Sequence, residues 1–268
     1  MPVNVFAFPV VAIQRMCSFE IKRLCYTDFI HYLQGLNQVT NLMEIIRTTG
    51  RAVFDLFFPK RCVSCNSIIS NENPVCILCA GNLPFTHWKL GKENPAFHKL
   101  DNLCRIRSAY SLLFFEHGNV TQSLLHNLKY ENQPKIGSLL AEKALSEINL
   151  KNFQGIIPVP IHPKKLKKRG YNQVMPFAKL LADESGIPLI DDFLIRIENN
   201  PSQVFKNREK RLNSIQNAFA LTDKKWEGHY ILTDDVLTTG ATLSTCINVI
   251  HSKNPGLKIS VITMAYAI

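Results

Sequence analysis

Apolar residues recur at helical spacing, and then in short runs, along the second half of the chain. Residues 120–128 and 136–140 repeat apolar side chains at intervals of three and four, which predicts two amphipathic helices. Residues 155–160 are an apolar run that two prolines end, which indicates a short buried strand. A further helix is expected from about Asn172 to Gly186, because Pro176 is tolerated in a first helical turn and glycine commonly ends a helix.

The pattern continues to the end of the sequence with a strand at 229–233, a helix at 241–251 and a final strand at 258–267. Strands that alternate with helices pair in parallel, because each helix carries the chain back to the same end of the sheet. The prediction for residues 105–268 is therefore an α/β domain with a parallel sheet flanked by helices.

The first part of the chain is patterned differently. Residues 1–42 carry no persistent helical stripe, and they are either an N-terminal extension or a stretch ahead of a natural start at Met43. Apolar positions over 43–57 fit one face of a helix that leads to Pro59. We therefore expect three parts, namely residues 1–42, a helix with a cysteine module over 43–104, and the α/β domain.

Four of the eight cysteines form two Cys-x2-Cys pairs, which are Cys62, Cys65, Cys76 and Cys79. Each pair brings two thiols to one ion, and four thiolates make a closed tetrahedral site of the kind that holds zinc. Because such a site has no open position for a substrate, we expect a structural, zinc-ribbon-like module. Two disulfides are the alternative, and the absence of a secretory signal disfavours them.

Downstream of the cysteine pairs, the side chains of His87, His98 and Cys104 are candidates for a substitute ligand or for a second metal site. An ordinary surface or core position is the simpler explanation for each of them. The two Cys-x2-Cys pairs therefore remain the specific signal.

Composition fits an ordinary globular protein with a net positive charge. Of 268 residues, 46% are hydrophobic and 19% charged, which excludes wholesale disorder and fibrous repeats. Lys and Arg number 31 against 21 Asp and Glu, and the net charge of +10 suggests a polyanionic partner or substrate. Charge alone does not choose between DNA, a phosphorylated small molecule and no such partner. The longest early apolar run, residues 3–13, is too short for a membrane span and lacks a basic leader and cleavage site. We expect a cytoplasmic protein with no membrane insertion.

The segment after the predicted strand at 229–233 combines two carboxylates with a Thr/Gly turn. Asp234 and Asp235 come first, and residues 238–242 read Thr-Thr-Gly-Ala-Thr where a helix is expected to begin. Hydroxyls, backbone N–H groups and a helix N-terminus bind phosphate, whereas carboxylates suit ribose hydroxyls or a metal-bound sugar. A sugar with a terminal phosphate satisfies both halves of the segment, and parallel sheets bind ligands at the carboxyl ends of strands. An Asp-capped helix without a ligand explains the residues singly but not the whole run.

This segment resembles the phosphoribosyl pyrophosphate (PRPP) signature of type I phosphoribosyltransferases. Further motifs in the chain make the resemblance narrower. They are the cysteine pairs, Leu128-Lys129-Tyr130, Pro158-Val159-Pro160, Arg169-Gly170-Tyr171-Asn172-Gln173 and the stretch from Gln203 to Arg211. Together they resemble the ComF family, a competence-associated group with a zinc knuckle before a phosphoribosyltransferase domain. The resemblance covers about residue 43 to the end and implies a type I phosphoribosyltransferase-like sheet.

The resemblance also implies roles for individual residues. Asp234 and Asp235 would hold the ribose hydroxyls of PRPP. The 5′-phosphate would lie on Thr238, Thr239, Gly240, Ala241 and Thr242, and the pyrophosphate side would be formed by Pro158, Val159, Pro160 and Arg169. Mg²⁺ would arrive largely on the substrate, because Mg²⁺ commonly keeps few protein ligands.

The implied reaction is displacement of pyrophosphate at the anomeric carbon by an acceptor that the sequence does not identify, and no catalytic residue is assigned. Two positions depart from the family pattern, since Thr233 replaces an aliphatic strand residue and Ser214 stands beside Asn213 where Asn is common. Glutamine amidotransferase activity is not supported, because Met1-Pro2 offers no N-terminal nucleophilic cysteine.

A basic run follows the predicted pyrophosphate turn and contains Lys164, Lys165, Lys167, Lys168 and Arg169. A solvated charge run is the ordinary explanation. Alternatively, the run binds pyrophosphate, or it binds the backbone of single-stranded DNA while Tyr171 stacks on a base. Two functions of different class follow. One is a PRPP-dependent transferase, and the other is a DNA-handling adaptor that uses the same fold in DNA uptake with competence proteins.

Overall fold

The computed structural model describes residues 58–70, 72–197, 218–222 and 226–268. The chain divides into two compact units, residues 1–60 and 61–268, and every described helix and strand belongs to the second. The helix expected at 43–57 lies outside the described residues, and the domain boundaries expected at residues 42 and 104 stay predictions.

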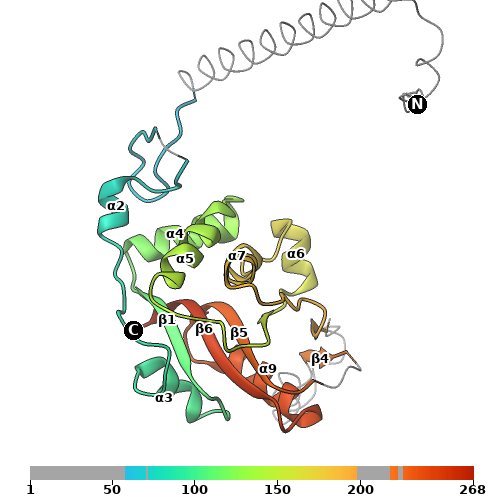
Figure 1. Ribbon diagram of the computed structural model, residues 1–268. Coiled ribbons are helices and arrows are strands. Elements are labelled where there is room, and N and C mark those ends of the chain that lie inside the picture. The colour runs from blue at the N-terminus through green and yellow to red at the C-terminus, as the bar shows by residue number, and fades with distance from the viewer. Residues whose placement is uncertain (1–57, 71, 198–217, 223–225) are drawn as a thin grey trace, which may run out of the picture. The chain divides into compact units, whose positions relative to one another are not determined.

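A four-stranded parallel sheet forms the centre of the unit (Figure 1), with strand order β1-β6-β5-β2. Its strands are β1 (Ala109–Phe115), β2 (Gly155–Pro158), β5 (His229–Leu237) and β6 (Lys258–Ala267). Most residues of β1 and β6 are buried, as expected of strands that are covered on both faces. The predicted α/β class, a parallel sheet with flanking helices, is confirmed.

Helices cover both faces of this sheet (Figure 1). Buried residues of α4 (Val120–Tyr130), α5 (Lys135–Leu145) and α7 (Met175–Ser185) belong to one hydrophobic core. Buried residues of α3 (Pro95–Asp101) and α9 (Ala241–Lys253) belong to the other core. The helices predicted at 120–128, 136–140 and 241–251 are confirmed.

Helix α7 begins at Met175 and not at the predicted Asn172, although Pro176 and Gly186 have the predicted places at its two ends. The Asn172 side chain accounts for the later start. It donates to the Val159 carbonyl at 3.0 Å and accepts from the Val174 backbone N–H at 3.1 Å, which holds Asn172 in the connecting turn.

Four short elements complete the unit. They are α2 (Ile77–Gly81), α6 (Pro163–Arg169) and the antiparallel pair β3 (Leu194–Arg196) and β4 (Phe219–Leu221). The cysteine module packs on the unit, because Cys62 and Cys79 belong to the same core as α4 and α5. In the described part of the chain, no helix combines the length and the apolar character that a membrane span requires.

Candidate functional site

The two aspartates lie within strand β5 and not in the loop that follows it. The strand predicted to end at residue 233 continues to Leu237, because its ladder with β6 continues through the pairs Asp234–Thr263 and Leu237–Tyr266. Side chains alternate between the two faces of a strand, so the neighbouring carboxylates leave the backbone in different directions. Both nevertheless line one hollow at the carboxyl ends of β5 and β2.

Asp235 is buried, and its carboxylate is held from several sides. Oδ2 accepts from Lys129 Nζ at 2.9 Å and from Gln173 Nε2 at 3.0 Å, while Oδ1 accepts from the Val236 backbone N–H at 2.7 Å. The side chains of Lys129 and Asp235 are 24% and 11% exposed, so solvent screens this ion pair less than a surface pair. The Asp235 carboxylate therefore has a fixed orientation and a compensated charge.

In contrast to those of Asp235, the surroundings of Asp234 disfavour an ionised carboxylate. Burial, together with the adjacent Asp235 carboxylate, raises the pKa of Asp234 to about 8, although Lys129 and Arg196 lower it in part. Its Oδ1 accepts from the Asp235 backbone N–H at 2.9 Å. In the ligand-free protein at neutral pH, the Asp234 carboxyl is therefore mostly protonated, and a cation in the hollow would favour its ionised form.

The raised pKa of Asp234 predicts a pH-dependent stability. A carboxyl whose pKa is higher in the folded state stabilises the fold fully below its unfolded pKa, and that contribution is lost as pH rises to about 8. We expect the ligand-free protein to lose stability from about pH 4 to about pH 8, and Asp234→Asn to remove at least about 1.4 kcal/mol of that loss, the equivalent of one pKa unit.

Thermal unfolding over this pH range measures the effect, and Asp183→Asn is the matched control, because Asp183 is an exposed carboxylate on α7 paired with Lys179. A pH profile that Asp234→Asn leaves parallel to that of the unsubstituted protein would contradict the assignment of the titration to Asp234.

Gln173 links the carboxylates to the basic run. Arg169 Nη1 donates to Gln173 Oε1 at 2.9 Å, which turns the Gln173 amide nitrogen toward Asp235. The sequence motifs contain Lys129 and Gln173, but sequence pattern alone does not place the two side chains at the site. The motifs Leu128-Lys129-Tyr130 and Arg169-Gly170-Tyr171-Asn172-Gln173 are the available signal.

The motifs at 128–130 and 169–173 also contact each other away from the carboxylates. The Arg169 guanidinium lies 5.0 Å from the centroid of the Tyr130 ring, within the range of a cation–π contact. The Tyr171 hydroxyl donates to the Leu128 carbonyl, and the partly buried Tyr171 ring packs against the core. The end of α4 and the turn between α6 and α7 are thereby held together.

Cationic and polar groups surround the hollow, which has a volume of about 170 Å³. Its lining comprises Lys129, Val159, Pro160, Ile161, His162, Lys165, Arg169, Gln173, Arg196, Asp234, Asp235 and Thr242. This volume is below the roughly 300–1,000 Å³ of a complete small-molecule pocket. The hollow therefore suits the charged part of a ligand whose remainder extends into solvent.

The Thr/Gly turn begins helix α9 beside the hollow. Gly240 has φ +80°, and a Cβ there would stand 2.9 Å from Leu103 Cδ1, so both conformation and space favour glycine. Thr238 and Thr239 are exposed, Gly240 at the N-cap of α9 has no side chain to offer, and the Thr239 hydroxyl accepts from the Ala241 backbone N–H at 3.4 Å. Hydroxyls and the positive end of a 13-residue helix therefore face outward together, as anion binding requires.

The Pro158-Val159-Pro160 turn lies at the same edge of the sheet. Pro158 pairs with Thr233 at the end of β2, and the Val159 backbone N–H donates to the Thr233 carbonyl at 2.9 Å. Val159 and Pro160 then line the hollow. Three of the predicted groups, namely the aspartates, the turn and Thr242, are thus brought together.

Helix α6 divides the basic run between two faces. Lys165 and Arg169 line the hollow, whereas Lys164, Lys167 and Lys168 are exposed and do not line it. Residues four apart share one face of a helix, which explains why Lys165 and Arg169 point the same way. The run predicted as one cluster therefore supplies two cations to the hollow and three to the outer surface.

The four predicted zinc ligands lie together. Their Sγ atoms are all within 4.8 Å of one another, and those of Cys65 and Cys76 are 3.6 Å apart. A tetrahedral zinc site with Zn–S bonds of about 2.3 Å places its sulfurs about 3.8 Å apart, whereas a disulfide needs about 2.05 Å. All four thiols are free in the structure, and this cluster could bind a zinc ion.

The three alternative ligands lie elsewhere. His87 is largely exposed, with Nδ1 3.7 Å from Glu147 Oε1, and His98 is on α3. The Cys104 thiol is buried in the core beside α9, where it donates to the Leu100 carbonyl at 3.5 Å. None of the three joins the four cysteines. The motif stretch from Gln203 to Arg211, with Asn213 and Ser214, lies outside the described residues.

Comparison with known proteins identifies several relatives. Competence protein F of Haemophilus influenzae is 26% identical over 215 residues, which cover 70% of this chain and 89% of that protein. DNA utilization protein YhgH of Escherichia coli O157:H7 is 25% identical over 195 residues, 68% of this chain and 80% of that protein. Competence protein ComFC of Bacillus subtilis is 33% identical over 110 residues, 41% of this chain and 43% of that protein. No protein-family model matches the chain.

Among solved structures, orotate phosphoribosyltransferase from Aeropyrum pernix aligns with a TM-score of 0.31 and 15% identity, covering 60% of this chain and 81% of that one. Adenine phosphoribosyltransferase from Leishmania tarentolae aligns with a TM-score of 0.32 and 14% identity, covering 66% and 89%. At such low TM-scores, the fold assignment rests on the observed strand order and flanking helices.

Proposed function

We propose that this chain, whose resemblance to the ComF family its relatives confirm, binds PRPP with Mg²⁺ and transfers or holds a 5-phosphoribosyl group. One observation carries the proposal. A carboxylate pair near the carboxyl end of a parallel strand is followed by a turn with exposed threonines and the N-terminus of a 13-residue helix, and cations line the hollow beside them.

The ribose hydroxyls are proposed to bind Asp234 and Asp235. Lys129 and Gln173 support this role, because they hold the Asp235 carboxylate in one orientation before any ligand arrives. The 5′-phosphate is proposed to lie on residues 238–242, where hydroxyls and the α9 N-terminus gather. An ionised Asp234 beside Asp235 would be favoured only when a cation enters, so ligand binding and deprotonation of Asp234 are expected to be coupled.

The pyrophosphate is proposed to lie between the turn at 158–160 and the cations Lys165, Arg169 and Arg196. These cations would stabilise the charge that develops on departing pyrophosphate as its bond to the anomeric carbon breaks. Mg²⁺ is proposed to come with PRPP and to neutralise the phosphates.

Zinc is proposed to be bound by Cys62, Cys65, Cys76 and Cys79. The fit of four soft thiolates at tetrahedral spacing supports it, and four protein ligands leave no position for a substrate. Its proposed role is therefore structural. The Val63 carbonyl accepts from Asn127 Nδ2 at 3.2 Å, so the module supports α4 two residues from Lys129.

Calorimetry with separate ligand fragments tests the proposal. We expect Mg²⁺-PRPP to bind with micromolar affinity, about 8 kcal/mol, and ribose 5-phosphate and pyrophosphate to bind more weakly and to compete with it. Absence of Mg²⁺-PRPP binding by folded protein would contradict the proposal. If ribose 5-phosphate and pyrophosphate bind without displacing Mg²⁺-PRPP, their binding positions do not belong to one PRPP site.

A second function, binding of single-stranded DNA, is favoured by the three outward-facing lysines of α6 and by relatives named for competence and DNA utilization. Phosphate-backbone binding weakens steeply with salt, so affinity for an oligonucleotide measured at two salt concentrations tests it. Substitution of Lys164, Lys167 and Lys168 by glutamine separates this function from PRPP binding, because none of the three lines the hollow.

A further inference from the structure

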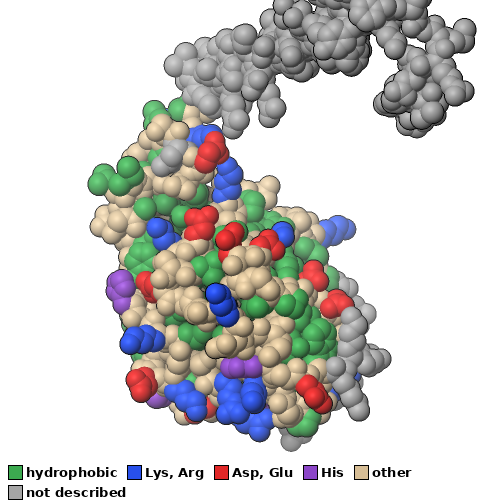
Figure 2. All heavy atoms as spheres, viewed as in Figure 1, with side chains coloured by type: hydrophobic (Ala, Val, Ile, Leu, Met, Phe, Trp, Pro, Cys, Tyr) green, Lys and Arg blue, Asp and Glu red, His purple; other side chains and the backbone are tan. Residues whose placement is uncertain are grey.

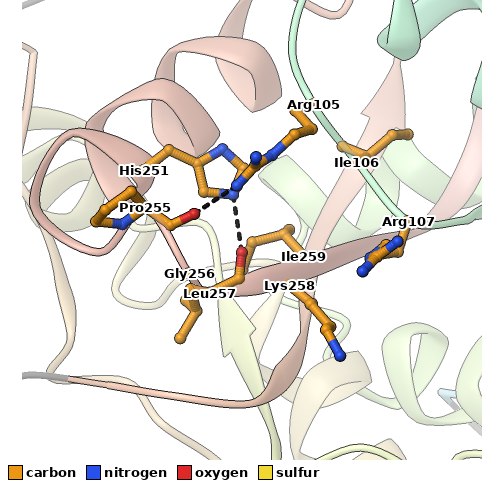
Figure 3. A pocket seen from close by; sticks show the side chains of 9 residues that line it. All are labelled: Arg105, Ile106, Arg107, His251, Pro255, Gly256, Leu257, Lys258 and Ile259. Carbon is orange, nitrogen blue, oxygen red and sulfur yellow. Dashed lines mark hydrogen bonds between the residues drawn. The ribbon is translucent and has the colours of Figure 1, made fainter.

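A second group of basic side chains lies at the opposite edge of the sheet, where the strands begin. Arg105 and Arg107 precede β1, Lys258 begins β6, and His251 is in the last turn of α9. With the turn at 255–257 they line a pocket of about 360 Å³ (Figure 3). In Figure 2, Lys and Arg side chains gather beside a histidine at the lower edge of the molecule, the side from which β1 starts in Figure 1.

This pocket is separate from the hollow proposed for PRPP. Strand β5 runs from His229 at this edge to Asp235 at the other, and at about 3.3 Å per residue the two positions are on the order of 20 Å apart. The two linings share no residue. Occupation of one site therefore leaves the contacts of the other intact.

One wall of the pocket is built by Arg105 and His251. The Arg105 guanidinium donates to the Pro255 carbonyl, and His251 Nε2 donates to the Leu257 carbonyl at 3.0 Å. Figure 3 shows the Arg105 side chain close to the His251 ring, over this turn. The turn carbonyls thus hold both side chains at the pocket instead of leaving them free in solvent.

The other wall is built by Arg107 and Lys258, which Figure 3 shows on the opposite side of the pocket. Their backbones are anchored in the sheet, since the Arg107 N–H donates to the Ile259 carbonyl at 2.8 Å and the Lys258 N–H donates to the Gly228 carbonyl at 2.9 Å. Both side chains are exposed. The charged ends of Arg107 and Lys258 can therefore turn toward a ligand in the pocket while their backbones stay in place.

The charges in the pocket are of one sign. Among the described residues, no carboxylate forms an ion pair with Arg105, Arg107 or Lys258. The positive charges also affect two nearby histidines. Burial and Arg105 lower the pKa of His251, and burial, Lys258 and Arg107 lower the pKa of His229. Like charges held together repel one another, and a bound anion relieves that repulsion.

We propose that this pocket is a second anion site, which takes the phosphate chain of a small phosphorylated ligand such as a nucleoside triphosphate. One guanidinium group can donate two parallel hydrogen bonds to a phosphate, and an ammonium group adds a mobile point charge. The volume falls within the roughly 300–1,000 Å³ of small-molecule sites. Cations that converge on a pocket fit a compact phosphate chain better than the extended backbone of a nucleic acid.

Calorimetric titration with inorganic tripolyphosphate, without Mg²⁺, tests the proposal. The triple variant Arg105→Gln/Arg107→Gln/Lys258→Gln is expected to bind tripolyphosphate at least about tenfold more weakly, because three charge-assisted contacts are lost. The matched control Lys89→Gln/Lys143→Gln/Lys179→Gln removes the same charge from exposed positions that line neither this pocket nor the hollow, and it is expected to keep the affinity. Equal losses in both variants would show only a response to net charge and would overturn the proposal.

Two further measurements separate this site from the others. Tripolyphosphate contains the pyrophosphate unit that the hollow is proposed to bind, so the titration is repeated in an Arg169→Gln background, where the binding that depends on Arg105, Arg107 and Lys258 is expected to remain. The triple variant is expected to retain Mg²⁺-PRPP binding, so failure of either proposal is recognised independently. Tripolyphosphate binding that depends on Arg169 and not on the three cations would overturn the proposal. A single-stranded oligonucleotide that binds through the three cations, when tripolyphosphate does not bind, would also overturn it in favour of a nucleic-acid surface.

Discussion

Asp234→Asn/Asp235→Asn is expected to weaken Mg²⁺-PRPP binding at least about 100-fold, because hydrogen bonds to charged groups contribute about 1.5–3 kcal/mol each. Two effects combine. Asparagine accepts hydrogen bonds from ribose hydroxyls less strongly than a carboxylate, and loss of the Asp235 charge leaves Lys129 partly buried without its partner. Removal of Asp234 also removes the group whose ionisation is expected to be coupled to ligand binding.

Asp183→Asn/Glu184→Gln is the matched control for this variant. Both residues are exposed on α7, away from the hollow, and the control makes the same change in formal charge. We expect its PRPP affinity to equal that of the unsubstituted protein. Unchanged affinity in the Asp234/Asp235 variant would remove these residues from the proposed site, and an equal loss in both variants would attribute the effect to net charge.

Removal of zinc is expected to lower the melting temperature by about 10 °C or more. At about 2–4 °C per kcal/mol for a protein of this size, such a shift corresponds to a loss of several kcal/mol. Structural zinc sites contribute directly to folding, and here Cys62 and Cys79 are buried in the core shared with α4 and α5. Without the metal, four thiols at tetrahedral spacing have no group to hold them there.

Zinc content by mass spectrometry and thermal unfolding with and without chelator measure this effect. Cys79→Ser is expected to lose both the zinc and the stability, whereas Cys246→Ala, a buried cysteine on α9 outside the cluster, is expected to keep its zinc. Protein purified without zinc but with two disulfides, or a melting temperature that chelation leaves unchanged, would contradict the assignment.

The periodic parts of the fold could be predicted from sequence, and the reasons are local. The leucines of α4 have a clear helical period, β6 is a nearly continuous buried run, and Gly186 ends α7 as expected. Helix α6 could not be found by periodicity, because Lys and Arg occupy most of it and none of its residues is buried. Its signals were Pro163 at its start and Gly170 with φ +80° at its end.

The candidate site was predictable only in part. Asp234, Asp235 and the Thr/Gly turn are contiguous, so their pattern is visible in the sequence. The contacts that orient Asp235 come from Lys129 and Gln173, which are far from it along the chain and meet it only in the folded unit. The extension of β5 beyond residue 233 likewise depends on pairing with β6, a long-range interaction that local pattern does not encode.

The most direct test of the PRPP site is backbone hydrogen exchange, measured with and without Mg²⁺-PRPP. Slower exchange is expected at residues 234–243, where the aspartates and the N-terminus of α9 would contact the ligand. Little change is expected at 105–107 and 255–259, at the opposite edge of the sheet. Slower exchange at that opposite edge, with none at 234–243, would contradict binding of PRPP at the end of β5.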